Sequence, residues 1–106
     1  MKYEIIVTDY TLDENGIVID RDGGTLYYND ADDFIEMWNY FKGKGPSKKI
    51  TEEVTENGKY LIMQPTEIAP YVTDYQVWGE SYELIKEWEA KERERYTENN
   101  NEELPF

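Results

Sequence analysis

The chain has 106 residues, which is the length of one small domain with a single hydrophobic core. Its 11 basic and 24 acidic side chains give a formal net charge of 11 − 24 = −13. A protein this acidic repels phosphate groups, so direct binding to nucleic acid or to an anionic membrane surface is disfavoured.

The residue types that carry most enzyme chemistry are missing. The chain contains no cysteine and no histidine, and its serines are Ser47 and Ser81. This excludes disulfides, thiolate metal sites, histidine acid–base catalysis and the usual nucleophilic triads. Pairs of carboxylates do not indicate a catalytic site in this chain, because with 24 acids some pairs are suitably spaced by chance. We therefore expect a protein that is not an enzyme and needs no cofactor.

The first part of the chain is rich in residues that favour strands. Strands are predicted at residues 2–8, 17–20 and 25–28, with turns at Asn15-Gly16 and at Asp22-Gly23-Gly24. The start of the chain lacks the apolar core of a signal peptide, and no apolar run reaches membrane-spanning length. A cytoplasmic location is the resulting expectation.

The stretch from Asn29 to Lys42 is predicted to be an amphipathic helix. Its apolar side chains recur at positions i, i+3, i+4 and i+7, and they are Phe34, Met37, Trp38 and Phe41. Asn29 or Asp30 is placed to cap the helix, and acids follow in the first turn. The basic run at residues 42–49 contains glycine and proline, which indicates an exposed loop rather than a phosphate-binding loop.

Two further strands are predicted at residues 50–56 and 59–64, joined by a hairpin turn at Asn57-Gly58. The second is the most apolar run of the chain and is expected to be the central strand. The segment at residues 66–77 is compatible either with an irregular connection or with an edge strand. A second helix is predicted from Trp78 or Ser81 to Tyr96, with an apolar stripe that fades after Ala90. Beyond that point the helix is expected to be held by i, i+4 charge pairs such as Glu87–Lys91 and Glu89–Arg93. Residues 97–106 have the composition of a disordered acidic tail. The expected fold is a single α+β domain over residues 1–96, with about five antiparallel strands and two helices in the order βββαββα.

Two short acidic runs, at residues 20–24 and 29–33, contain the oxygen ligands that calcium prefers. Neither has the glycine and glutamate positions of an EF-hand loop. A turn and a helix cap explain the two runs, so no metal site is expected.

The acidic residues of the two predicted helices fall on helix faces. Carboxylates three or four residues apart lie about 4.5–6 Å apart along a helix axis, and duplex DNA carries about one charge per 1.7 Å. Rows of carboxylates at this spacing can occupy a surface built for phosphates. The candidate partner-binding acids are Asp30, Asp32, Asp33, Glu36, Glu80, Glu83 and Glu87. A charge that only keeps the domain soluble is the alternative interpretation.

In size and charge the chain resembles the DNA-mimic inhibitors of phages and other mobile elements, which include anti-restriction and anti-CRISPR proteins. That resemblance implies a small inhibitor or regulator that binds a basic, nucleic-acid-handling protein such as a nuclease.

The last five residues resemble the acidic tip of bacterial single-stranded DNA-binding proteins. The matching residues are Glu102, Glu103, Leu104, Pro105 and Phe106. In that family the tip ends in acids followed by an aliphatic residue, proline and phenylalanine, and it docks on replication and repair proteins. The resemblance implies an alternative function, an accessory protein that recruits such partners through its tip. The rest of the chain departs from that family, because it is acidic where a strand-binding surface is basic and aromatic.

Overall fold

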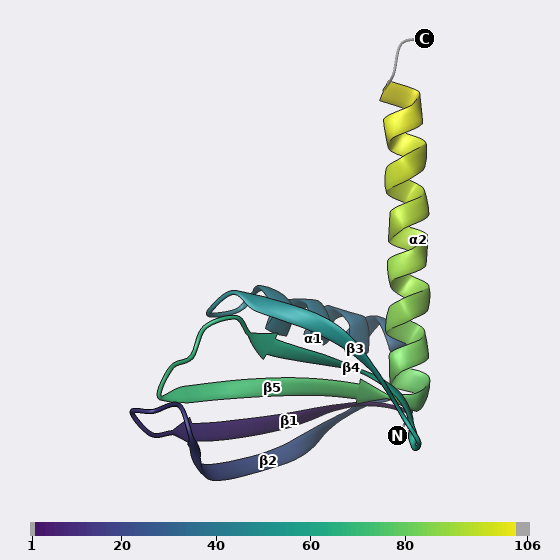
Figure 1. Cartoon of the computed structure of the whole chain (residues 1–106). Helices are drawn as coiled ribbons and strands as arrows, with labels where there is room; N and C mark the ends of the chain where they lie inside the picture. The colour runs from purple at the N-terminus through teal and green to yellow at the C-terminus, as the bar shows by residue number, and fades with distance from the viewer. Residues whose placement is uncertain (1, 104–106) are drawn as a thin grey trace.

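The computed structural model describes residues 2–103, with side-chain placement described up to Glu94. It contains one five-stranded antiparallel sheet and two helices. The elements are β1 (Tyr3–Leu12), β2 (Val18–Tyr28), α1 (Ala31–Gly43), β3 (Lys48–Thr55), β4 (Gly58–Pro65), β5 (Tyr71–Trp78) and α2 (Gly79–Glu103). The strand order across the sheet is β2-β1-β5-β4-β3 (Figure 1). The predicted α+β class with five antiparallel strands is therefore confirmed, although the order of elements is ββαβββα.

The predicted turn at Asp22-Gly23-Gly24 is wrong, because these residues lie inside the continuous strand β2. A Cβ atom at Gly23 would lie 2.6 Å from the backbone oxygen of Val7 on the neighbouring strand. Glycine is required there by the close approach of two backbones, and not by a change of chain direction. The turn at Asn15-Gly16 is confirmed, since Gly16 has a φ of +80° and β1 and β2 pair on either side of it.

The segment that the sequence left undecided forms β5, which lies at the centre of the sheet. It pairs with β1 through Ile6–Gln76 and with β4 through Leu61–Val77. The strand at Lys59–Gln64, which was expected to be central, becomes β4, one position from the β3 edge. The Asn57-Gly58 hairpin between β3 and β4 is confirmed.

Both helices pack on the same face of the sheet. From α1, the Phe34 ring stacks on Tyr3 at 5.4 Å between centroids, and Phe41 stacks on Tyr75 at 4.5 Å. From α2, Tyr82 and Ile85 are buried in the same cluster. The remaining members of that buried cluster are Ile5, Phe34, Trp38, Leu61, Met63 and Val77. All four residues of the predicted apolar stripe of α1 belong to this core or pack against it.

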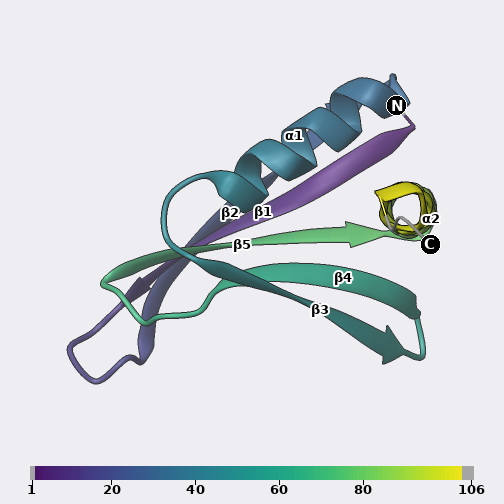
Figure 2. The ribbon, with the colours of Figure 1, turned by 90° about the horizontal axis from the view of Figure 1, so that it is seen from above.

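The second helix extends well beyond the sheet. It leaves the sheet directly after β5 and stands at a steep angle to the strands, whereas α1 lies along them (Figures 1 and 2). It continues past Tyr96, its predicted end, to Glu103. The tail expected from residue 97 thus overlaps the end of α2, and Leu104, Pro105 and Phe106 lie outside the described residues. Of the charge pairs expected on this helix, Lys91 and Glu87 form one with an N–O distance of 3.6 Å.

Candidate functional site

The direction of two strands brings the acidic beginnings of both helices to one end of the sheet. Both β2 and β5 are antiparallel to β1, so they run in the same direction and finish at the same end. Each leads almost immediately into a helix, β2 into α1 and β5 into α2. We call this the helix end of the sheet, and it contains Tyr28 and Trp78. In Figure 2 the beginning of α1 and the axis of α2 lie toward the same side of the molecule.

The first turn of α1 carries the acids that the sequence predicted there. Asp30 occupies the N-cap position with an extended backbone, and its carbonyl oxygen accepts a hydrogen bond from the N–H of Phe34 at 3.1 Å. Its side chain makes no capping hydrogen bond, so the expected side-chain cap at this residue is not formed. Asp32 and Asp33 lie in the first turn, where carboxylates favour the positive end of the helix dipole. Glu36 follows on the exposed side of the helix.

The candidate acids of α2 lie on the side of the helix that faces solvent. Glu80 lies in its first turn, and Glu83 and Glu87 follow one and two turns later. All three are exposed, because the buried side of this helix is formed by Ser81, Tyr82 and Ile85. The structure therefore places the predicted acids of both helices on exposed surface near one end of the sheet.

These carboxylates are poorly neutralised by the protein itself. Within the described part of the chain, ion pairs join Lys86 to Glu52 and Lys91 to Glu87. No ion pair is formed by the acids of α1 in that part of the chain. Their negative charge is therefore not offset by an ion pair within the described residues.

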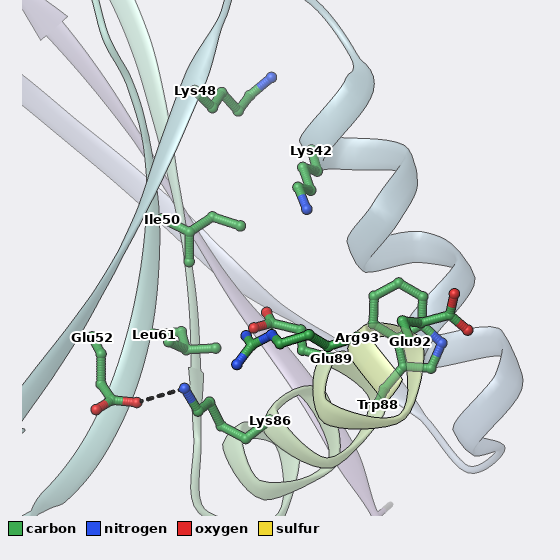
Figure 3. Close-up of a pocket in the computed structure, with 10 residues that line it drawn as sticks. All are labelled: Lys42, Lys48, Ile50, Glu52, Leu61, Lys86, Trp88, Glu89, Glu92 and Arg93. Carbon is green, nitrogen blue, oxygen red and sulfur yellow. Dashed lines mark ion pairs between the residues drawn. The ribbon is translucent and has the colours of Figure 1, made fainter. Parts of the chain in front are cut away.

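The basic residues gather elsewhere, around a cleft between the end of α1, the edge strand β3 and the second to fourth turns of α2 (Figure 3). Its volume is about 810 Å³, and its basic lining residues are Lys42, Lys48, Lys86 and Arg93. Ile50 and Leu61 form an apolar floor, and Glu52, Glu89 and Glu92 also contribute to the lining. The sequence had predicted an exposed basic loop at residues 42–49, but it could not show that α2 supplies the opposite wall of a cleft.

A hydrogen-bonded group joins α2 to β3 beside this cleft. The Tyr82 hydroxyl donates to Glu52 Oε1 at 2.8 Å, and Lys86 Nζ lies 3.2 Å from the same oxygen. The hydrogen bonds from Tyr82 and Lys86 lower the pKa of Glu52 below its usual value. The hydrogen bond to Glu52 and burial raise the pKa of Tyr82 to about 12. These contacts join α2 to the edge strand β3.

Asp74 is the one buried carboxylate among the described residues, with 7% of its surface exposed. It lies on β5 and contributes to a small cavity of about 260 Å³ that Lys49 and Gln64 also line. Burial raises the pKa of Asp74, while hydrogen bonds from Gln64 and Tyr10 act in the opposite direction. Sequence reasoning did not single out this residue, since nothing in its neighbourhood distinguishes it from other acids.

In the described part of the chain, no group of three or more potential metal ligands is close enough to hold an ion. The helices described there also lack the combination of length and apolar character needed to cross a membrane. Comparison of the chain with protein-family models, with curated proteins and with solved structures found no match.

Proposed function

We propose that this protein is a small acidic inhibitor or regulator of a basic protein that handles nucleic acid. The carboxylates at the helix end of the sheet would occupy the partner's phosphate-binding surface. The observation that carries this proposal is the meeting of two acidic helix beginnings at one end of the sheet, with no neutralising ion pair at the α1 acids within the described residues.

The charge of the molecule supports the same proposal. A net charge of −13 on 106 residues steers the protein toward positive surfaces and away from nucleic acid. Successive exposed acids on α2 are three or four residues apart, which is about 4.5–6 Å along the helix axis. This spacing is compatible with a surface that contacts successive phosphates.

The test is competition between this protein and DNA. A fluorescent duplex is bound to each member of a panel of nucleases and restriction or CRISPR complexes, and its release is followed by anisotropy as the protein is added. The proposal requires release of DNA from at least one of them. If the protein displaces DNA from none of them, the proposal is wrong.

A charge-reversal variant locates the surface. Changing Asp30, Asp33 and Glu36 to Lys changes the net charge by +6, from −13 to −7. The matched control changes Glu14, Asp20 and Asp22 to Lys, which gives the same net charge with exposed residues at or toward the opposite end of the sheet. Loss of displacement in the first variant with retention in the control supports the helix end as the binding surface. Equal loss in both would indicate a general charge effect.

A second candidate function is an accessory role in DNA replication or repair through residues 102–106. The course of α2 favours it, because this helix leads away from the sheet and extends to Glu103 (Figure 1). Deletion of residues 102–106 separates the two functions. Lost binding to a replication or repair protein supports docking by the tip, while unchanged displacement of DNA supports the folded acidic surface.

A further inference from the structure

The face of the sheet that points away from both helices is richer in apolar side chains than a solvated sheet face normally is. Its residues follow from the strand register, since they alternate with the buried residues Ile5, Leu61 and Val77. We call it the helix-free face. Its apolar members are Ile6, Tyr10, Leu12, Tyr27, Tyr60, Ile62, Val72 and Trp78.

Apolar side chains lie on both sides of the central strand of this face. Ile6 and Ile62 both pair with Gln76, one from each side, so they flank the central strand β5. The rings of Tyr60 and Trp78 stack with 4.2 Å between their centroids. The centre of the face therefore combines half-buried aliphatic and aromatic side chains with the uncharged Gln76, and no helix lies over it.

The helix-free face is nearly neutral on a strongly acidic molecule. Its charged residues are Glu4, Arg21, Lys49, Glu53 and the buried Asp74. Depletion of charge at the centre of a surface patch is typical of protein–protein interfaces. A basic partner is not favoured by such a face, and nucleic acid or an anionic membrane is repelled by the rest of the molecule.

The few charges on the face are arranged so that a reversed copy would complement them. Lys49 lies on β3 toward the end of the sheet that carries the Asn15-Gly16 turn, and Glu53 lies on the same strand toward the helix end. On the other side of the sheet, Arg21 lies toward the turn and Glu4 lies toward the helix end. Apart from the buried Asp74, the positive charges of the face thus lie toward the turn and the negative charges toward the helix end.

We propose that two copies of this protein pack through their helix-free faces, related by a twofold axis that lies between the faces and crosses the strands. Such an axis reverses the strands but keeps β3 over β3 of the other copy. Lys49 of each copy then faces Glu53 of the other, and the Arg21 half of one face lies over the Glu4 half of its partner. The centre of the face, where Ile6 and Ile62 flank Gln76, then packs against the same residues of the other copy, as an isologous interface requires.

The size of the face sets the strength of the dimer. Five strands about 4.8 Å apart and about seven residues along each strand give a face of roughly 500 Å² per copy, or roughly 1,000 Å² in total. This is at the lower limit for a specific interface, so the dimer forms at micromolar concentrations rather than nanomolar ones. Added salt strengthens it, because salt screens the repulsion between two molecules of charge −13.

The experiment is sedimentation velocity of the whole protein from about 1 to 500 μM, with circular dichroism as a check on folding. The wild type is expected to pass from monomer to dimer within this range. Ile62→Lys places a charge at the centre of the face and should abolish the dimer, while Val54→Lys is the matched control because Val54 is 69% exposed on the helix-bearing side of β3. A wild type that stays monomeric throughout overturns the proposal.

A charge exchange tests the arrangement without touching the core. Glu53→Lys and Lys49→Glu should each weaken the dimer about tenfold, because the twofold axis makes each change count twice. The double variant K49E/E53K should return to within about twofold of the wild type. Glu53→Lys makes the protein less acidic, so a general charge effect would strengthen association instead of weakening it. A dimer that is insensitive to Ile62→Lys, or a double variant no better than the single ones, overturns the proposal.

Discussion

The hydroxyl oxygen of Ser81 accepts a hydrogen bond from the backbone N–H of Glu4 at 2.9 Å, which ties the first turn of α2 to the beginning of β1. Ser81 is 2% exposed, so this N–H has little access to water as an alternative acceptor. The contact joins residues 77 positions apart and fixes the end of β1 beside the point where β5 becomes a helix. It therefore helps to hold the acidic helix end in one geometry.

Replacing Ser81 by Ala should lower the free energy of unfolding by about 1–3 kcal/mol, because the Glu4 N–H is left without its partner. Urea unfolding followed by tryptophan fluorescence measures the change. Ser47→Ala is the control, since Ser47 is exposed and its backbone oxygen, rather than its side chain, accepts the hydrogen bonds from Thr66. A loss of similar size in both variants would contradict this role for Ser81.

Neighbouring glycines in β2 provide a matched pair of substitutions. Gly23→Ala should destabilise the protein by about 1–3 kcal/mol, because the new Cβ would lie 2.6 Å from the Val7 oxygen and must push two strands apart. Gly24→Ala meets no atom within 4 Å and should change stability by about 0.5 kcal/mol or less. Thermal unfolding of the two variants measures the difference. An equal loss of stability in the two variants would contradict the close approach of Gly23 to the Val7 backbone oxygen.

Asp74 makes the stability of the protein depend on pH in an unusual direction for a carboxyl group. Burial raises its pKa in the folded protein, so its contribution to stability is present at low pH and is lost as the pH rises through the folded value. Above its folded pKa the ionised carboxylate is less favourable in the folded protein than the protonated form, so Asp74→Asn should raise the free energy of unfolding there. The difference from wild type should shrink as the pH falls below about 4, where Asp is protonated in the unfolded chain as well. A difference between Asp74→Asn and wild type that does not change with pH would contradict this role for Asp74.

Glu52 makes the stability of the protein depend on pH in the opposite direction. Its pKa is lowered by Tyr82 and Lys86, so its contribution is present above the pKa of an unfolded Glu and is lost as the pH falls through the folded value. Tyr82→Phe removes one of these hydrogen bonds. The free energy of unfolding should therefore decrease less in this variant than in wild type as the pH falls through the range in which Glu52 is protonated. Because the pKa of Tyr82 is about 12, absorbance of tyrosinate at 295 nm should be equal in wild type and variant near pH 10 and differ by one tyrosine only above pH 12. A difference at pH 10 would contradict the Glu52–Tyr82 hydrogen bond.

The elements that could be predicted from the sequence are those determined by short-range patterns. The stripe of α1 and the turns at Asn15-Gly16 and Asn57-Gly58 need only local residues, and all three are present in the structure. By contrast, β5 was not recognised as the central strand, because Thr73, Asp74 and Gln76 interrupt its apolar pattern. Asp74 is tolerated there since Gln64 and Tyr10 on the neighbouring strands hydrogen-bond to it. Such a compensation is not visible in one segment of sequence.

The candidate site was predictable only as separate pieces. The acids at Asp30, Asp32 and Asp33 could be assigned to a helix beginning, as could Glu80. Their meeting at one end depends on β2 and β5 running in the same direction, which requires the strand order. The interruption of β2 by Gly23 had indicated a turn, and a turn there would have reversed the direction of the strand that leads into α1.

The unequal burial of α2 implies a gradient of protection against amide hydrogen exchange along one helix. Its first two turns contribute Ser81, Tyr82 and Ile85 to the packed interior, whereas the side chains described near Glu94 are largely exposed. A helix beyond its last packing contact is held mainly by local hydrogen bonds and charge pairs, which are weak in water. We expect amides near Ile85 to exchange only on global unfolding and those near Glu94 to exchange by local opening, at rates that rise along the helix. A partner that binds the outer turns would slow hydrogen exchange most at the amides there, so the exchange profile would also show where the partner binds.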